Sequence, residues 1–225
     1  MILGLDTATA STAVGLWAPG GPEVERRDDP PLGARPAHAG RLLLLVEEVL
    51  ADAATDWDAV ERIAVGVGPG GFTGLRIGIA TARALAQARD LPLVGVSSLE
   101  ALAEGVRPHT GSDPIGSDPI AVFAVIDARR GEVFAASPGR LGARALTPEA
   151  LTQVIVPGAL AVGDGAVRFR DELEGAGAVV PADDSPLHRV SAVHVARLGA
   201  AAEPAGRDAL LPDYRREPDA KPRQQ

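Results

Sequence analysis

The sequence predicts an α/β fold of two lobes that each begin with the same strand–turn–strand unit. Short apolar runs typical of buried strands alternate with two longer segments that have helical periodicity. A stretch rich in Pro, Gly, Ser and Asp, residues 107–120, interrupts this alternation near the middle of the chain. On either side of it, residues 2–17 and 121–137 share one plan: an apolar strand that ends in Asp, a short turn and a returning strand. A duplication would explain this likeness, although two hairpins also resemble each other by chance.

Composition excludes several classes of protein. The 225 residues are 46% hydrophobic, which is typical of a globular chain with room for two small cores. The net charge of −8 argues against binding nucleic acid unaided, because neutralising phosphates requires clustered Lys and Arg. The absence of cysteine excludes a disulfide framework, a thiolate zinc site and a cysteine nucleophile. Since neither a signal peptide nor a run of about 18 apolar residues is found, we expect a cytoplasmic protein without membrane contact.

Apolar periodicity and turn residues place the elements of the first lobe. A capping box at Ser97 and Glu100 opens a short helix that ends near Gly105. Strands are expected at 2–6, 11–17, 23–29, 61–68 and 91–96, and two long helices at 37–53 and 72–89.

The second half of the chain is less regular. The pentapeptide GSDPI occurs twice in tandem within residues 107–120, a composition typical of a loop or linker. Beyond the second hairpin, we expect a strand, a Gly-rich turn and a helix at 158–173, and a helix at 191–200. The predicted organisation is a first lobe at 1–106, a linker at 107–120, a smaller second lobe at 121–212 and a polar tail at 213–225.

The Gly-rich segment VGVGPGGFTGLRIGIATARALA, residues 65–86, looks at first like a phosphate-binding loop. A P-loop requires Gly-Lys-Ser/Thr, and the only lysine of the chain is Lys221. Gly66, Gly68 and Gly71 match the dinucleotide pattern G-x-G-x-x-G, but the strand that follows ends in serine, where that fingerprint has an acidic residue. Neither nucleotide motif fits this segment well.

Close packing explains these glycines better. A glycine inside a helix costs about 1 kcal/mol relative to alanine, so Gly74 and Gly78 predict another backbone lying against this helix. The apolar residues of the preceding helix cover an arc of roughly 160°, more than one sheet face requires, and Leu44 lies outside even that arc. The two helices therefore contact either each other within a deep core or another protein.

Five segments of the chain resemble the TsaB (YeaZ) family, the dimerisation subunits of the bacterial tRNA threonylcarbamoyladenosine machinery. They are ILGLDTAT, RPAHAGRLLLLVEEVL, GVGPGGFTGLRIGIATARALA, LPLVGVSSLEALA and AVIDARRGEVFAA. The resemblance covers about the first 137 residues well, and LAVGDGA and LLPDYRR weakly. It implies an actin/Hsp70/sugar-kinase-like (ribonuclease H-like) fold of two lobes, the second one reduced.

The resemblance also implies a function. A TsaB-like chain is a non-catalytic scaffold that pairs with the catalytic paralogue TsaD, and the ATPase TsaE joins them in transferring threonylcarbamoyl to the tRNA adenosine beside the anticodon. Contact with tRNA then occurs through the complex, and a homodimer is expected without the partner. The family's pairing helices correspond to interface residues His38, Leu42, Leu44, Leu45, Val49, Phe72, Thr73, Gly74, Arg76, Ile77, Gly78, Thr81, Arg83 and Leu85.

The nucleotide-site positions of the fold are expected to be vestigial here. Asp6, Thr7, Asp127 and Arg129 occupy them, but TATAS after Asp6 lacks the glycine that lets a backbone approach phosphate. The resemblance implies no intrinsic cofactor, and leaves ATP or ADP with Mg²⁺ a place only at the subunit interface of the complex.

We expect neither a catalytic residue nor a metal site. The catalytic paralogue holds its metal through two histidines at i and i+4, whereas His38 is followed at i+4 by leucine. Two alternatives stay open: a stand-alone kinase-like enzyme that hydrolyses nucleotides with Asp6 and Asp127, and a self-associating protein without a tRNA role.

Overall fold

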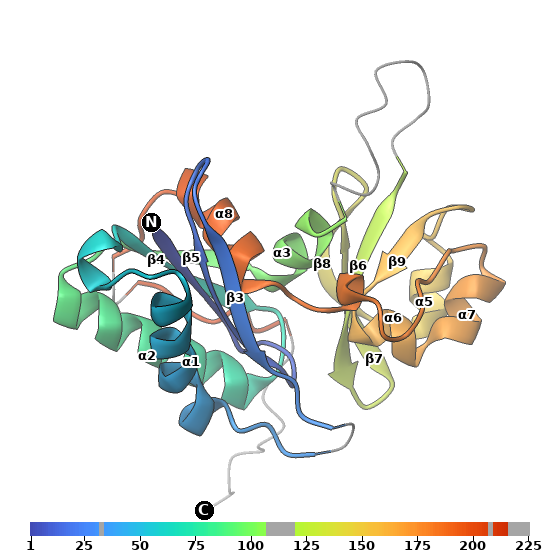
Figure 1. Ribbon diagram of the computed structural model, residues 1–225. Coiled ribbons are helices and arrows are strands. Elements are labelled where there is room, and N and C mark those ends of the chain that lie inside the picture. Colours follow the sequence, from blue (N-terminus) through green and yellow to red (C-terminus); the bar gives the residue numbers. More distant parts are fainter. Residues whose placement is uncertain (32–33, 107–119, 207–208, 216–225) are drawn as a thin grey trace, which may run out of the picture.

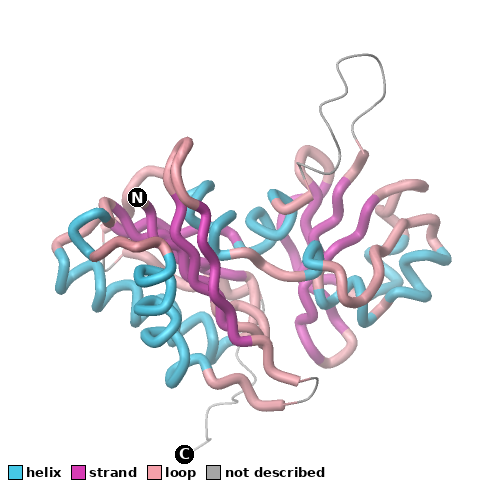
Figure 2. Tube along the Cα trace, in the orientation of Figure 1, coloured by secondary structure: helices cyan, strands magenta, loops and turns pink. Residues whose placement is uncertain are grey.

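The protein consists of two α/β lobes that lie side by side, as the computed structural model shows (Figure 1). The structure describes residues 1–31, 34–106, 120–206 and 209–215. The tandem GSDPI repeat falls almost wholly outside these residues. Each lobe contains one sheet with helices packed against it, and Figure 2 shows the two sheets apart from each other. No helix within the described residues is both long and apolar enough to span a bilayer.

The first sheet has five strands in the order β3-β2-β1-β4-β5. β1 (Ile2–Asp6) and β2 (Thr12–Trp17) pair antiparallel and are buried almost throughout, as their continuous apolar sequences predict. β3 (Glu23–Asp28) is a charged edge strand, which protects the sheet from pairing with other chains. β4 (Arg62–Gly68) and β5 (Leu93–Ser97) add parallel to β1.

Two long helices cover one face of this sheet (Figure 1). α1 (His38–Asp52) and α2 (Phe72–Arg89) begin at the same end of the sheet, because each follows a strand that ends there. Their apolar faces and that of the sheet form one cluster, into which Leu42, Leu45 and Val49 project from α1. A short 3-10 helix, η1 (Trp57–Ala59), precedes β4.

The second sheet repeats the topology of the first, in the order β8-β7-β6-β9. Its first three strands form an antiparallel meander and β9 adds parallel to β6, as β4 does to β1. The predicted fold class is thereby confirmed. The elements of this lobe are β6 (Val122–Arg129), β7 (Glu132–Ser137), β8 (Leu141–Leu146), α5 (Pro148–Thr152), β9 (Leu160–Val162), α6 (Asp164–Arg168), α7 (Arg170–Gly175) and η2 (Pro186–His188). The sequence did not predict β8 or α5.

The C-terminal helix does not belong to the second lobe, contrary to the predicted boundary at residue 212. α8 (Ala192–Ala201) packs on the first sheet, on the face opposite α1 and α2 (Figure 1). Gly4 and Gly15 pair across β1 and β2, and a Cβ on either would collide with the backbone of α8. The glycines of these two strands therefore make the groove in which α8 lies.

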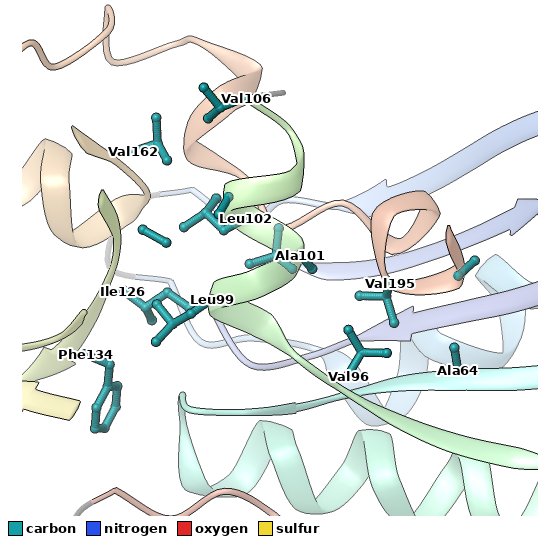
Figure 3. Close-up of a cluster of buried hydrophobic side chains, with 14 of the residues drawn as sticks. Ala64, Val96, Leu99, Ala101, Leu102, Val106, Ile126, Phe134, Val162 and Val195 are labelled. Atoms are coloured by element: carbon teal, nitrogen blue, oxygen red, sulfur yellow. The ribbon is translucent and has the colours of Figure 1, made fainter. Parts of the chain in front are cut away.

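A continuous apolar cluster joins the lobes. α3 (Ser98–Glu104) lies between the sheets, and its Leu99 and Leu102 are fully buried. Figure 3 shows these side chains between Val195 of α8 on one side and Ile126 and Val162 of the second sheet on the other. Complete burial of a leucine stabilises by roughly 1.5–3 kcal/mol, so α3 contributes to the stability of the contact between the lobes.

Candidate functional site

Asp6 lies at the end of β1, and its carboxylate is enclosed. The side chain is 2% exposed. Oδ1 accepts a hydrogen bond of 2.9 Å from the backbone N–H of Ala8, and Oδ2 accepts one of 2.7 Å from Ser98 Oγ. Burial raises the pKa of Asp6, and the bonds from Ser98 and Ala8 oppose that rise. Both oxygens are thus engaged within the chain.

Gly66 has a role in this enclosure. A Cβ at this position of β4 would overlap the Asp6 carboxylate and crowd Ser98 Oγ. Gly66, the first glycine of the Gly-rich segment, therefore leaves the space that the buried Asp6 side chain occupies.

The turn after β1 explains the next glycines. Thr7 Oγ1 donates a hydrogen bond of 2.8 Å to the carbonyl oxygen of Gly74. A Cβ on Gly74 would collide with the carbonyl oxygen of Thr7, and a Cβ on Gly78 with Thr7 Oγ1. The N–H of Gly71 donates to the carbonyl oxygen of Ala8 at 2.7 Å. The expectation that Gly74 and Gly78 admit a partner's helix is wrong, because the chain's own turn occupies that space.

His38 likewise serves the interior of the chain. Its Nδ1 lies 2.8 Å from Thr12 Oγ1, and the residue is 5% exposed. Burial lowers its pKa, so the imidazole is neutral near pH 7. His38 joins the start of α1 to β2, in place of the interface contact that was expected of it.

The second lobe repeats the local geometry of Asp6 at Asp127. The N–H of Arg129 donates to Asp127 Oδ1 at 2.8 Å, two residues along the chain, as Ala8 donates to Asp6. Asp127 Oδ2 accepts a bond of 2.7 Å from Arg168 and lies 3.5 Å from the Arg129 guanidinium. The two arginines therefore compensate the charge of the Asp127 carboxylate within the chain.

A second aspartate of this site was not predicted from the sequence. Asp164, at the start of α6, accepts a hydrogen bond of 3.0 Å from the N–H of Asp127. Burial, with a contribution from the nearby Asp127 charge, raises the pKa of Asp164 to about 6. The signal that could have identified it is the Gly-rich turn before α6, where Gly163 adopts a φ of 114° and lets the helix start against β6.

The predicted interface residues fall into three groups by exposure. His38, Leu42, Leu45, Val49, Gly74 and Gly78 are buried within the chain, Ile77, Thr81, Arg83 and Leu85 are partly buried, and Leu44, Phe72, Thr73 and Arg76 are exposed. The six buried residues cannot contact a partner in this conformation. Their assignment is corrected accordingly.

Exposed apolar and small residues remain on both helices. Leu43, which belongs to the predicted apolar arc of α1, is 52% exposed, and the adjacent Leu44 is 47% exposed. Small residues face outward on α2 at helical spacing. We call this the α1–α2 surface and define it as Leu43, Leu44, Thr73, Arg76, Ile77, Ala80 and Ala84.

A family model and two relatives show which known proteins this chain resembles. The model of the family described as TsaD, tRNA N6-adenosine threonylcarbamoyltransferase, matches residues 30–158. The tRNA threonylcarbamoyladenosine biosynthesis protein TsaB of Escherichia coli is 38% identical over 133 residues, which are 59% of this chain and 52% of that protein. An uncharacterised protein of Mycobacterium tuberculosis is 35% identical over 98% of this chain and 94% of its own length.

A solved structure supports the same relationship. YeaZ from Pseudomonas aeruginosa superposes with a TM-score of 0.74 at 29% identity, over 95% of this chain and 98% of that one. The chain spans about half the length of the Escherichia coli TsaB. The family model nevertheless covers more than half of this chain, and the YeaZ fold covers nearly all of it. The chain therefore belongs to the TsaB (YeaZ) family, within the family that the TsaD model describes.

Proposed function

We propose that this chain is a non-catalytic subunit of the tRNA threonylcarbamoyladenosine machinery, which pairs with the catalytic paralogue TsaD and, through it, works with TsaE. We infer the pathway from relatives of this chain that are named tRNA threonylcarbamoyladenosine biosynthesis protein TsaB. The chain contacts tRNA through the assembled complex, in keeping with its net charge of −8.

The enclosure of Asp6 is the observation that carries the non-catalytic assignment. A carboxylate that holds a metal needs an oxygen accessible to that metal. In Asp6, one carboxylate oxygen accepts a hydrogen bond from the N–H of Ala8 and the other accepts one from the hydroxyl of Ser98. Asp127 is engaged by Arg168 and Arg129. This arrangement disfavours the alternative of a stand-alone nucleotide-hydrolysing enzyme. ATP or ADP with Mg²⁺ is proposed to bind only where the two subunits meet.

The α1–α2 surface is the proposed site of pairing. Leu43 and Leu44 are exposed in succession on α1, where periodicity alone would bury one of them. Ala80 and Ala84 are exposed on α2, and their side chains are small enough for a helix of another protein to approach the backbone of α2. An exposed apolar helix face of this kind is typical of an interface, and it also supports a homodimer when TsaD is absent.

Reconstitution tests the proposal. With TsaD, TsaE and the enzyme that makes the threonylcarbamoyl adenylate, we expect transfer to tRNA to depend on this chain and to survive Asp6→Asn. The chain alone should hydrolyse no ATP. Magnesium-dependent hydrolysis that Asp6→Asn abolishes would overturn the proposal in favour of an enzyme. A homodimer that excess TsaD leaves intact would favour a self-associating protein.

A further inference from the structure

The C-terminal segment, residues 209–215, lies against the first lobe, close to α2. Leu210 is 7% exposed and packs into the cluster under α1 and α2. A Cβ on Gly95 would collide with its side chain, so a glycine in β5 makes room for it. The N–H of Asp213 donates to the carbonyl oxygen of Val67 at 2.8 Å. These contacts give the segment a defined position.

Two arginines of α2 hold the segment in place through hydrogen bonds. The Arg83 guanidinium donates to the carbonyl oxygen of Leu210, and Arg76 Nε donates to the hydroxyl of Tyr214 at 2.9 Å. Both arginines were expected to contact a partner directly. In the structure they also hold residues 209–215 of the chain against α2.

An aromatic stack results at the first turn of α2. The rings of Phe72 and Tyr214 lie 5.1 Å apart at an interplanar angle of 27°, and the guanidinium carbon of Arg76 lies 3.8 Å above the Phe72 ring. Only 3% of the chain is aromatic, and Tyr214 is its single tyrosine. Leaving two of these few rings partly exposed gives up stabilisation that their full burial would provide, unless a partner covers their exposed faces.

The stack is only half covered. Phe72 is 40% exposed, Tyr214 41%, and Leu211, three residues before Tyr214 in the chain, 70%. Arg76 is also exposed, and within the described residues its guanidinium contacts the Phe72 ring and the Tyr214 hydroxyl without forming an ion pair. Tyrosine and arginine are enriched among the residues that dominate the binding energy of an interface, and phenylalanine is enriched in interfaces generally.

We propose that the C-terminal segment is a third element of the surface that binds TsaD, with Phe72, Leu211 and Tyr214 as its apolar anchor. The inference rests on the proposed function. Continuity supports this occupant, because Phe72 and Arg76 lie on the same helix as Thr73, Ile77 and Ala80 of the α1–α2 surface. The partner places apolar side chains on the anchor and a carboxylate against Arg76.

The test measures the dissociation constant for TsaD by isothermal titration calorimetry, with the melting temperature of each variant alongside. We expect Leu211→Asp and Tyr214→Ala each to weaken binding at least tenfold. Leu211 is mostly exposed, so its variant should melt like the wild type. Tyr214→Phe keeps the ring stack and should bind within about threefold of wild type. Val154→Asp is the matched control, since Val154 is a comparably exposed apolar residue of the second lobe.

The outcomes separate this inference from the proposed function. If the wild type binds TsaD and Leu44→Asp weakens binding, while Leu211→Asp and Tyr214→Ala bind normally, the anchor is overturned and the proposed function stands. If the wild type does not bind TsaD, the proposed function itself fails. If Leu211→Asp abolishes only self-association in sedimentation, the occupant is a second copy of this chain and the inference is wrong.

Discussion

Thr7 and Gly74 lie against each other, joined by a hydrogen bond of 2.8 Å from the threonine hydroxyl to the glycine carbonyl oxygen. The two residues are 67 positions apart in the chain. Their contact places the turn after β1 on the first turns of α2. Gly74 and Gly78 of that helix therefore serve the folding of this chain.

Gly74→Ala should destabilise the monomer. The new Cβ collides with the backbone carbonyl of Thr7, which cannot rotate away. Overpacking of this kind costs about 1–3 kcal/mol, and we expect a loss of that size in urea unfolding. Gly40→Ala is the matched control, because Gly40 lies in α1 with open space around it. It should raise stability by up to about 1 kcal/mol. Equal effects of the two substitutions would contradict this role of Thr7.

Substitution by Asp should affect partner binding at Leu44 of α1 and folding at the adjacent Leu45. Leu44 is 47% exposed and Leu45 1%. Leu44→Asp should change the free energy of unfolding by no more than about 0.5 kcal/mol while weakening the complex with TsaD. Leu45→Asp should unfold the chain, because it buries a carboxylate without a partner. Circular dichroism and size-exclusion chromatography with TsaD measure the two effects. A Leu44→Asp variant that pairs like the wild type would remove α1 from the interface.

The pKa of Asp164 predicts a pH dependence of stability. A carboxyl whose pKa rises from 3.8 unfolded to about 6 folded contributes stability below the unfolded value, and that contribution is lost as pH rises to about 6. Asp164→Asn removes the cost of ionisation and keeps an oxygen that can accept from Asp127. We expect the variant to melt higher than the wild type at pH 7 and close to it at pH 4. Thermal denaturation across this range gives the comparison, and a constant difference would show that ionisation is not the cause.

Ser98→Ala should destabilise the chain in a pH-dependent manner. It leaves a buried Asp6 oxygen without its donor, a loss of about 1–3 kcal/mol at pH 7. Because Ser98 favours the charged carboxyl, its removal raises the pKa of Asp6 further, and the loss should shrink at low pH. Ser97→Ala removes only a helix cap, so its cost of about 1 kcal/mol should not change with pH.

The sequence predicted the elements of the first lobe better than their contacts. Phe72–Arg89 was assigned to the residue, because a long periodic pattern after a glycine turn is unambiguous. β8 was missed, since its small and charged residues LGARAL carry no clear alternation. Periodicity shows which residues of a helix share a face, but not whether the chain itself or another molecule covers it. For this reason Gly74 and Gly78 were assigned to an interface, although the chain's own Thr7 covers them.

The sequence predicted where the aspartates of the candidate site lie, but not which residues contact their carboxylates. Asp6 and Asp127 follow directly from the two hairpins, because Asp6 ends β1 and Asp127 lies two residues before the end of β6. Ser98 and Arg168, which engage these carboxylates, are 92 and 41 residues away along the chain. No local pattern reveals such partners. Only the fold shows that both carboxylates are already occupied.

The position of α8 has a consequence for the order of folding during synthesis. Gly4 and Gly15 on β1 and β2 form the groove for α8, yet this helix follows the whole second lobe along the chain and ends at Ala201. The first sheet can therefore complete its packing only after the second lobe has been synthesised. Until then, one face of β1 and β2 has no helix to cover it.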